Sequence, residues 1–323
     1  MPHHFRVDRS SLLGIAAILL WSATVALARS ISERIGPLTA GAAVYLGGSA
    51  LLAGSLLARR RSLGVLRQLP ARYLFGCGAL FVLYTLSLFL GLGLAASRPQ
   101  AIEVALLNYL WPALTILFSL VLLGKRATLG LIPGSLLALA GVCLVLAQGA
   151  AISWRSFSAN LLSNPAAYGL GALAAVTWAL YSNLTRRWGG SDSQGAVLLF
   201  TLGTGLAFLL MGRIHPEAGA WGARVAAEVA CLALATVAAY VFWDIAMREG
   251  DMVLVASCSY LTPFFSTVVS CLYLRVWPTL SLWVGCLLII AGSFLSWRAI
   301  REPAGEPPGP AVRQAAAGSS ISS

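Results

Sequence analysis

The sequence predicts an all-α membrane protein of ten transmembrane helices, arranged as two inverted five-helix repeats with both termini in the cytoplasm. Three observations predict this fold. The 323 residues are 59% apolar and only 10% charged, with a mean hydropathy of +0.82. Basic residues alternate in density from loop to loop, and two stretches 151 residues apart resemble each other. Soluble proteins are roughly 45–50% apolar and about 25% charged, so lipid is the expected solvent of this surface.

Ten segments are long and apolar enough to cross a hydrocarbon core of about 30 Å, which requires roughly 20 helical residues. They are residues 11–29, 38–58, 73–96, 101–123, 129–147, 166–185, 194–211, 225–246, 252–273 and 279–297. The first also imitates a signal peptide, because Arg6 and Arg9 precede it and Ala26-Leu27-Ala28 offers a cleavage site. Cleavage would delete one member of the repeat described below, so we expect the segment to be retained.

These segments divide the chain into five parts. We predict a cytoplasmic N-terminus at 1–10, a first five-helix repeat at 11–147, a periplasmic loop at 148–165, a second repeat at 166–297 and a cytoplasmic tail at 298–323. The tail is rich in Pro, Ser, Ala and Gly beyond residue 302 and is predicted to be disordered.

The net charge of +11 would ordinarily suggest nucleic acid as a partner. Cytoplasmic loops of membrane proteins retain excess Arg and Lys, and here 15 of the 22 basic residues fall on one set of alternate loops and tails. They are Arg6, Arg9, Arg59, Arg60, Arg61, Arg67, Arg72, Lys125, Arg126, Arg186, Arg187, Arg248, Arg298, Arg301 and Arg313. The charge therefore indicates topology, places both termini in the cytoplasm and makes nucleic-acid binding unexpected.

An internal duplication relates the two halves. A shift of 151 residues lays 104–144 on 255–295 with 16 identities in 41 positions, including a Tyr-Leu-x-Pro sequence and an Ala-Gly pair. A weaker match at a shift of 157 lays Gly14 and Trp21 on Gly171 and Trp178. Five helices per half is an odd number, so the second half enters the membrane in the opposite orientation. Inverted repeats of this kind are typical of transporters with a midplane substrate site and alternating access.

Each half ends in a Tyr-Leu-x-Pro helix followed by a Gly-x-x-Leu-x-x-Ala-Gly helix, and this pattern resembles the EamA-type members of the drug/metabolite transporter superfamily. The stretches 98–112 and 178–187 are similar, more narrowly, to the bacterial aromatic amino-acid exporters of that superfamily. The resemblance implies an inner-membrane exporter of aromatic and other apolar amino acids. A broad-specificity metabolite or drug exporter is the alternative.

Two central prolines, Pro112 and Pro263, are expected to shape a substrate cavity. Each removes a helical hydrogen bond and frees the carbonyl four residues earlier, on Asn108 and Ser259. A freed carbonyl at that depth needs a protein partner or a water-filled cavity. Such carbonyls could accept an ammonium group, whereas Asn, Ser, Thr or Tyr side chains could hold a carboxylate. A kink satisfied by neighbouring helices is the simpler interpretation of either proline alone.

Aromatic side chains inside the spans are the second expected component of the site. With the polar residues, the predicted cavity lining is Trp21, Tyr84, Asn108, Tyr109, Trp111, Trp178, Tyr181, Tyr240, Ser259 and Tyr260, and Trp243 is a further aromatic residue inside a span. Stacking with a few oriented polar groups suits a flat aromatic or apolar ligand, although any one of these residues could simply be packing.

Ionisable residues at the membrane midplane would mark a proton or ion pathway, and the sequence places none there. Glu103 and Glu228 fall in first helical turns, where a carboxylate favours the helix dipole, and Asp244 precedes Arg248 by four residues, the spacing of a helical ion pair. Small multidrug members of the superfamily depend on a glutamate in their first helix, where this chain has Trp21, Ser22 and Thr24. Proton coupling is therefore doubtful, and facilitated efflux is left open.

The remaining function classes find little support. No nucleotide-binding loop is present, and the six cysteines have no C-x-x-C spacing. We expect no ATP, cofactor or metal, no enzymatic activity, and function as a monomer. A receptor or intramembrane enzyme would need a signalling or catalytic element that the sequence does not contain.

Overall fold

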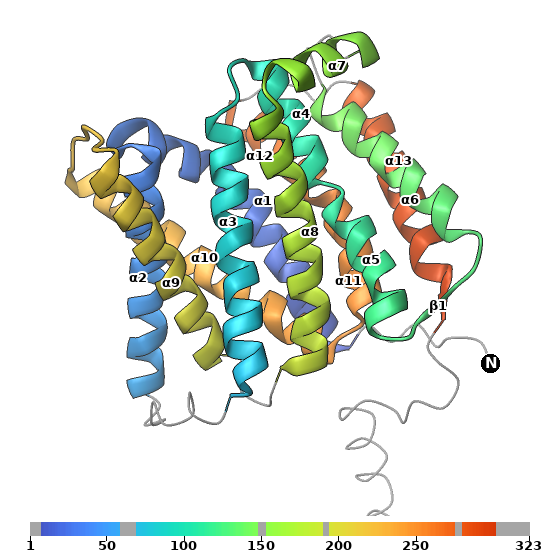
Figure 1. The fold of residues 1–323 in the computed structure, drawn as a ribbon, viewed down its shortest axis with the longest axis horizontal. Helices are drawn as coiled ribbons and strands as arrows, with labels where there is room; N and C mark the ends of the chain where they lie inside the picture. Colours follow the sequence, from blue (N-terminus) through green and yellow to red (C-terminus); the bar gives the residue numbers. More distant parts are fainter. Residues whose placement is uncertain (1–7, 59–68, 148–152, 190–193, 275–279, 302–323) are drawn as a thin grey trace, which may run out of the picture.

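The computed structural model describes residues 8–58, 69–147, 153–189, 194–274 and 280–301, and within them the chain is almost entirely helical (Figure 1). The predictions for the start of the cytoplasmic N-terminus (1–7), for Arg59 to Arg61 and for a disordered tail at 302–323 lie outside the described residues.

A helix or a short series of helices occupies each of the ten expected segments. The first half contains α1 (Arg9–Ile35), α2 (Pro37–Ala58), the π-helical turn η2 (Arg72–Cys77) with α3 (Gly78–Gly93), α4 (Arg98–Asn108) with α5 (Trp111–Leu122), and α6 (Leu131–Leu146). The second half contains α8 (Pro165–Trp188), α9 (Gln194–Ile214), α10 (Ala223–Glu249), α11 (Met252–Cys258), the 3-10 turn η3 (Ser259–Leu261), α12 (Thr262–Leu274) and α13 (Leu280–Arg298).

By length and apolar composition, seven helical segments of the described chain can cross a membrane, or eight if the bent α1 counts as one span. Two expected spans fall short of that test. Helix α6 has only 16 residues, and α8 carries buried polar side chains, including Thr177, Ser182 and Asn183, that lower its hydropathy.

The expected breaks at the two prolines are present. Helix α4 ends at Asn108 and α5 begins at Trp111, just before Pro112. In the second half, α11 ends at Cys258 and a 3-10 turn precedes α12, whose second residue is Pro263. A proline ring cannot donate the helical hydrogen bond and clashes with the carbonyl four residues earlier, which explains why both segments divide at this point.

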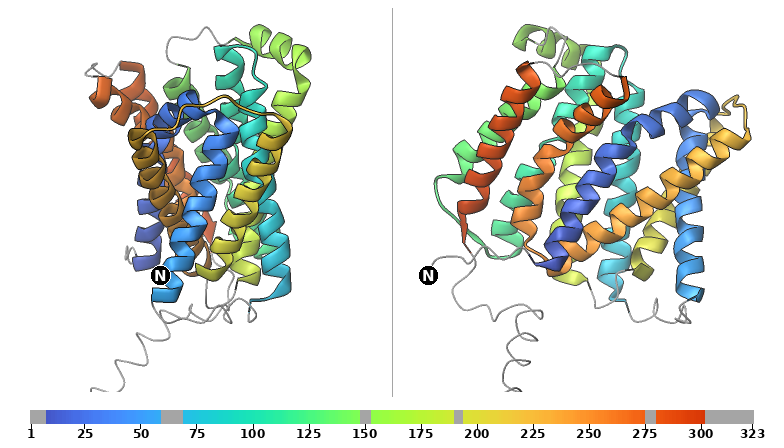
Figure 2. Two further views of the ribbon diagram at one scale, coloured as in Figure 1. Left: turned by 90° about the vertical axis from the view of Figure 1, so that its left-hand side faces the viewer. Right: turned by 180° about the vertical axis from the view of Figure 1, so that it is seen from behind.

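The helices pack in pairs that join the two halves. Helix α6 packs along α13, α1 along α10, α2 along α9, and α3 along α8 (Figures 1 and 2). At the α6–α13 contact, a Cβ atom on Gly141 would lie 2.6 Å from the Gly285 carbonyl oxygen, and one on Gly292 would lie 2.6 Å from that of Gly134. These four glycines are the ones that the 151-residue shift superimposes, and only glycine permits such close backbone approach.

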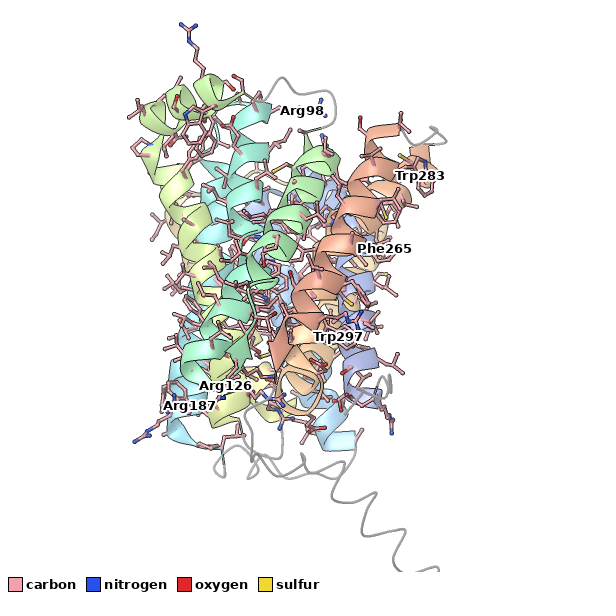
Figure 3. The ribbon with its side chains drawn as sticks, turned by 90° about the vertical axis from the view of Figure 1, so that its right-hand side faces the viewer. Arg98, Arg126, Arg187, Phe265, Trp283 and Trp297 are labelled. Carbon is pink, nitrogen blue, oxygen red and sulfur yellow. The ribbon has the colours of Figure 1, made fainter. Side chains whose placement is uncertain are left out.

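Two described basic residues of the predicted cytoplasmic loops lie at the same end of the bundle. Arg126 and Arg187 lie at this end and Arg98 at the other (Figure 3). The two-residue strands β1 (Arg126–Ala127) and β2 (Ile300–Arg301) pair antiparallel there, which ties the start of α6 to the end of α13. Arg126 and Arg187 are thus separated from Arg98 as the charge pattern predicts.

The predicted periplasmic loop at 148–165 is not simply a loop. Residues 148–152 lie outside the described chain, but α7 (Trp154–Ser163) follows them, and α8 begins at Pro165. Ser153 caps α7 by a capping box with Ser156. That local signal, a serine three residues before a second hydrogen-bonding serine, was present in the sequence but falls in a segment too short and polar to cross a membrane.

Candidate functional site

A cavity of about 330 Å³, the central cavity, lies between α1, α2, α3 and α10, with one residue of α9. Its walls are mostly aromatic and aliphatic. The lining residues are Trp21, Thr24, Ala28, Ser32, Pro37, Ala40, Gly41, Val44, Tyr45, Tyr84, Thr85, Leu88, Phe89, Leu92, Phe208, Leu232, Thr236 and Tyr240. The volume falls in the range of small-molecule sites, roughly 300–1,000 Å³.

Helical periodicity explains which residues face the cavity. On α1 the lining residues Trp21, Thr24, Ala28 and Ser32 recur every three or four positions, so they form one face of the helix. They lead from the middle of the bundle to Pro37 at the start of α2. The cavity therefore reaches the end of the bundle opposite Arg126 and Arg187.

Apart from the indole N–H of Trp21, the polar side-chain groups of the cavity are hydroxyls, and none of its lining residues is charged. The hydroxyls of Tyr45 and Tyr240 lie 2.8 Å apart in a hydrogen bond between α2 and α10. Thr24 donates to the carbonyl of Leu20, and Thr85 to the carbonyl of Phe81. The two threonines therefore present lone pairs to the cavity, whereas the tyrosine pair presents a donor proton.

An aromatic cluster forms the inner boundary of the cavity. The ring of Trp21 lies 5.8 Å from Trp178 and 5.3 Å from Trp243, and Trp178 lies 4.4 Å from Tyr84. Trp111 meets Trp243 edge-on at 5.3 Å. These edge and tilted contacts are the favoured geometries of aromatic pairs, so the cluster presents ring faces and edges to a ligand.

Beyond this cluster lies a network of buried polar side chains, and this end of the bundle is here called the closed end. Arg248 donates to Asp244 at 3.1 Å, and the Tyr73 hydroxyl also donates to Asp244. Arg186 of α8 donates to the Gly250 carbonyl at 2.8 Å. These bonds join α10 to the α3 and α8 side of the bundle, and the predicted i,i+4 pair of Asp244 with Arg248 is confirmed.

The structure brings together six of the ten predicted lining residues. Trp21, Tyr84 and Tyr240 line the cavity, and Trp111, Trp178 and Tyr181 belong to the aromatic cluster and its surroundings. The other four, Asn108, Tyr109, Ser259 and Tyr260, do not line it. Tyr109 and Tyr260 pack with α6 and α13 residues instead.

The proline-freed carbonyls were expected to serve the site, and one of them is already used. The Ser259 carbonyl accepts from the Thr262 hydroxyl at 2.7 Å. At Pro263 the protein itself therefore satisfies the freed carbonyl, as the simpler interpretation of the kink expects. Asn108 is buried, and its Oδ1 atom has no hydrogen-bond partner among the described residues.

Sequence reasoning missed several residues of the site. Tyr45, Thr85, Thr236 and Phe208 line the cavity, and Phe81 and Trp243 join the aromatic residues around Trp178. Helix α2 is apolar on nearly all sides, so its sequence does not indicate which face carries function. Trp243 was recognised as an aromatic residue inside a span but was not included in the predicted lining.

The prediction that Glu103 and Glu228 fall in first helical turns is wrong, because α4 begins at Arg98 and α10 at Ala223, and each carboxylate therefore lies in the second turn. Glu103 is buried and accepts from the Tyr168 hydroxyl and from Asn160 at 3.1 Å, so packing of α7 and α8 rather than the helix dipole fixes it. Glu228 accepts from Arg224 at 2.9 Å and from Ser30 at 3.2 Å. Among the described residues, no group of three or more His, Cys, Asp or Glu could hold a metal ion.

Comparison with known proteins identifies relatives along nearly the whole chain. The sequence model of the EamA-like transporter family matches residues 9–147 and again residues 165–298. The aromatic amino acid exporter YddG of Salmonella typhimurium is 36% identical over 296 residues, covering 91% of this chain and 99% of that protein. Its namesake in Escherichia coli is 34% identical with the same coverage. A solved crystal structure, 32% identical, superimposes with a TM-score of 0.74 and covers 89% of this chain and 96% of its own.

Proposed function

Because the chain belongs to the EamA-like transporter family and is a multi-pass membrane protein, we propose that it exports aromatic and other apolar amino acids across the bacterial inner membrane. The observation that carries this proposal is the central cavity. It has the volume for an amino acid, no charged lining residue, and Trp21, Tyr84 and Tyr240 around its inner end. The aromatic exporters named above support the substrate class.

The proposed architecture is ten spans in two inverted repeats, at 11–147 and 166–297, with cytoplasmic termini. Two contacts support it by recurring in both halves. The Cβ position of Gly14 falls against Val255, and that of Gly171 falls against Val104. The shifts that relate the repeats exchange these two pairs, as the crossed contacts of Gly134 with Gly292 and Gly141 with Gly285 also do. An axis in the membrane plane produces reciprocal contacts of this type.

The same relation supports a proposal of alternating access. The cavity reaches the end opposite Arg126 and Arg187 (Figure 3), which is the periplasmic end in the proposed topology. The 157-residue shift lays the cavity residues Thr24 and Ala28 on Tyr181 and Thr185. Both hydroxyls of that second pair are buried, without a hydrogen-bond partner in the described chain. Such groups are costly to bury, and opening of the closed end would hydrate them.

The proposed site consists of the cavity residues Trp21, Tyr84 and Tyr240 with Trp111, Trp178 and Tyr181 behind them. Asn108, Tyr109, Ser259 and Tyr260, with the breaks at Pro112 and Pro263, are proposed to take part as the helices move. One chain encloses the cavity, which supports transport by a monomer, and transport is proposed to run without ATP.

Counterflow in proteoliposomes tests the function directly. Vesicles loaded with unlabelled phenylalanine should accumulate labelled phenylalanine and methionine, and empty vesicles should not. A gradient of pH is applied in a second series, and equal rates with and without it would exclude obligatory proton coupling. If unrelated drugs and metabolites inhibit phenylalanine counterflow as strongly as amino acids do, the result would instead favour the broad-specificity exporter.

Trp178 offers the sharpest test of the site. Its ring contacts Trp21, Tyr84 and Trp243, so Trp178→Ala removes the centre of the aromatic boundary. We expect phenylalanine counterflow to fall at least about tenfold. Loss of a buried aromatic contact costs a few kcal/mol of binding free energy, at roughly 1.4 kcal/mol for each factor of ten. Trp283, half exposed on the outer face of α13 (Figure 3), provides the matched control. Unchanged counterflow by Trp178→Ala would argue against this site.

A further inference from the structure

We propose that the paired hydroxyls of Tyr45 and Tyr240 bind the carboxylate of the exported amino acid, with Thr85 as an acceptor for its ammonium group. This inference rests on the proposed function and deepens it. It names the residues of the cavity that bind the carboxylate and ammonium groups common to all amino acids. The aromatic boundary around Trp178 would then hold the side chain of the substrate.

The two tyrosines are placed to act together. Tyr45 comes from α2 and Tyr240 from α10, and their hydroxyl oxygens lie 2.8 Å apart at the wall of the cavity. Neighbouring rings fix both side chains. Tyr45 stacks on Phe208 at 5.9 Å, and Tyr240 lies 4.6 Å from Phe81 and 5.7 Å from Trp21. The pair is therefore positioned before a substrate arrives, which lowers the entropic cost of binding.

A carboxylate can replace the bond that the two hydroxyls make with each other. In that bond one tyrosine donates to the other, and one proton is left over. A carboxylate that enters between them can accept from both hydroxyls, one on each oxygen. Hydrogen bonds to an ionised acceptor are roughly twice as strong as neutral ones, so the exchange favours binding of the anion.

Two of the three threonines of the cavity cannot take over this role. Thr24, like Thr85, uses its proton on a carbonyl of its own helix, and Ser32 donates to the Ala28 carbonyl at 2.8 Å. These hydroxyls can accept but not donate without breaking a helical contact. Thr85 lies beside Tyr45, so donor and acceptor groups sit next to each other, as the adjacent carboxylate and ammonium of an amino acid require.

The absence of charge from the lining residues fits this assignment. A fixed arginine or lysine would hold a carboxylate strongly and would also attract anions without an ammonium group. Neutral donors and acceptors together recognise a zwitterion, and their moderate strength permits release. The cavity is therefore expected to discriminate against substrates with a net charge.

Competition for labelled phenylalanine counterflow tests the assignment with three ligands. Phenylalanine carries both groups, phenylalaninamide lacks the carboxylate, and 3-phenylpropionate lacks the ammonium group. Tyr45→Phe and Tyr240→Phe each remove one hydroxyl and keep the ring. We expect each variant to bind phenylalanine about tenfold more weakly, the scale of one hydrogen bond to a charged group, and to weaken phenylalaninamide by a clearly smaller factor, because its carbonyl oxygen is a neutral acceptor.

A matched control comes from a second pair of buried hydroxyls. Ser49 of α2 and Thr201 of α9 lie 2.8 Å apart, also between two helices, but neither lines the cavity. Thr201→Val removes one hydroxyl of that pair and should leave the preference for phenylalanine over its amide at the unsubstituted level. Thermal unfolding of each purified variant confirms that the compared proteins are folded.

The outcomes separate this inference from the proposed function. If the unsubstituted protein does not transport phenylalanine at all, the proposed function fails. If it does, but the tyrosine variants weaken phenylalanine and phenylalaninamide equally, or weaken neither, the carboxylate assignment is overturned. Loss of preference in Thr201→Val as well would show that the effect comes from helix packing, and would overturn it too.

Discussion

The two ends of α10 carry the same kind of ion pair in opposite surroundings. At the cavity end, Arg224 donates to Glu228 at 2.9 Å, with side chains 70% and 15% exposed. At the closed end, Arg248 donates to Asp244 at 3.1 Å, with side chains 7% and 0% exposed. Both pairs have the i,i+4 spacing, so the sequence alone treats them alike. Because the Asp244–Arg248 pair is buried, breaking it should destabilise the protein far more than breaking the exposed Arg224–Glu228 pair.

The hydrogen bonds around these pairs also differ in what they join. At the cavity end, Ser30 links α1 to Glu228 of α10, and Asn164 links the start of α8 to the Leu94 carbonyl after α3. Each link stays on one side of the cavity. At the closed end, Tyr73 and Arg186 link the α3 and α8 side to α10. This difference between the hydrogen bonds at the two ends is the one that the proposed alternating access would require.

Asp244→Ala should produce the largest effect, because it leaves Arg248 buried without its carboxylate. Breaking a buried pair in this way costs roughly 3–5 kcal/mol. We expect a marked fall in the thermal midpoint of the purified protein and loss of counterflow. Glu228→Ala is the matched control on the same helix. An exposed pair contributes only about 0–1 kcal/mol, so its midpoint should hardly change, and equal losses at the two ends would contradict the comparison.

Thiol labelling should show the same difference from within the helices. In a variant without native cysteines, Ala28→Cys places a thiol in the cavity, and Thr185→Cys places one at the repeat-related, buried position of α8. In the purified protein, where the reagent reaches both ends of the bundle, we expect a maleimide to react at position 28 at least about tenfold faster than at position 185, as for a state that is populated below roughly 10%.

Weakening the closed end should lower the ratio of the labelling rate at position 28 to that at position 185. Asp244→Asn keeps the size of the side chain and removes its charge, so the closed end should open more often. Labelling at position 185 should then rise while labelling at position 28 falls. A rise at both positions would indicate general loosening of the bundle instead of alternating access, and no change at either would mean that the ion pair does not hold the closed end.

Much of this arrangement could be predicted from sequence, because apolar runs, proline breaks and helical spacing are local signals. The breaks at Pro112 and Pro263 and the pairing of Asp244 with Arg248 needed no knowledge of neighbouring helices. The aromatic cluster was predicted as a set for a similar reason. Tyrosine and tryptophan away from the membrane interfaces need buried partners, and Trp21, Trp178 and Tyr240 found them in one another.

What the sequence did not reveal depends on contacts between helices. Nothing local separates Tyr45, which lines the cavity, from Tyr109, which packs toward α6 and α13. Nor could the sequence indicate that Thr262 would satisfy the carbonyl freed by Pro263, because that bond depends on a 3-10 turn. The conformation itself, open at one end, is a property of the packed bundle.

Two glycines at the ends of α10 provide the test with the smallest expected effect. Gly222 precedes the helix and Gly250 follows it, and both have backbone angles that any residue can adopt. A Cβ atom on Gly250 would lie 2.9 Å from the Ser11 backbone nitrogen and 2.9 Å from the Ala246 carbonyl oxygen, whereas one on Gly222 would meet nothing within 4 Å. Gly250→Ala should therefore cost about 1 kcal/mol by overpacking, and Gly222→Ala should stay within about 0.5 kcal/mol.

The thermal midpoint measures both glycine variants, and maleimide labelling of the Thr185→Cys thiol shows where the strain acts. Because the Gly250 carbonyl accepts from Arg186 of α8 at the closed end, displacing this residue in the alanine variant should also raise labelling at position 185, by a smaller factor than Asp244→Asn. Gly222→Ala should leave that labelling unchanged. If the two alanines shift the midpoint and the labelling alike, the closed end is no more tightly packed than the cavity end, and the asymmetry on which alternating access rests is lost.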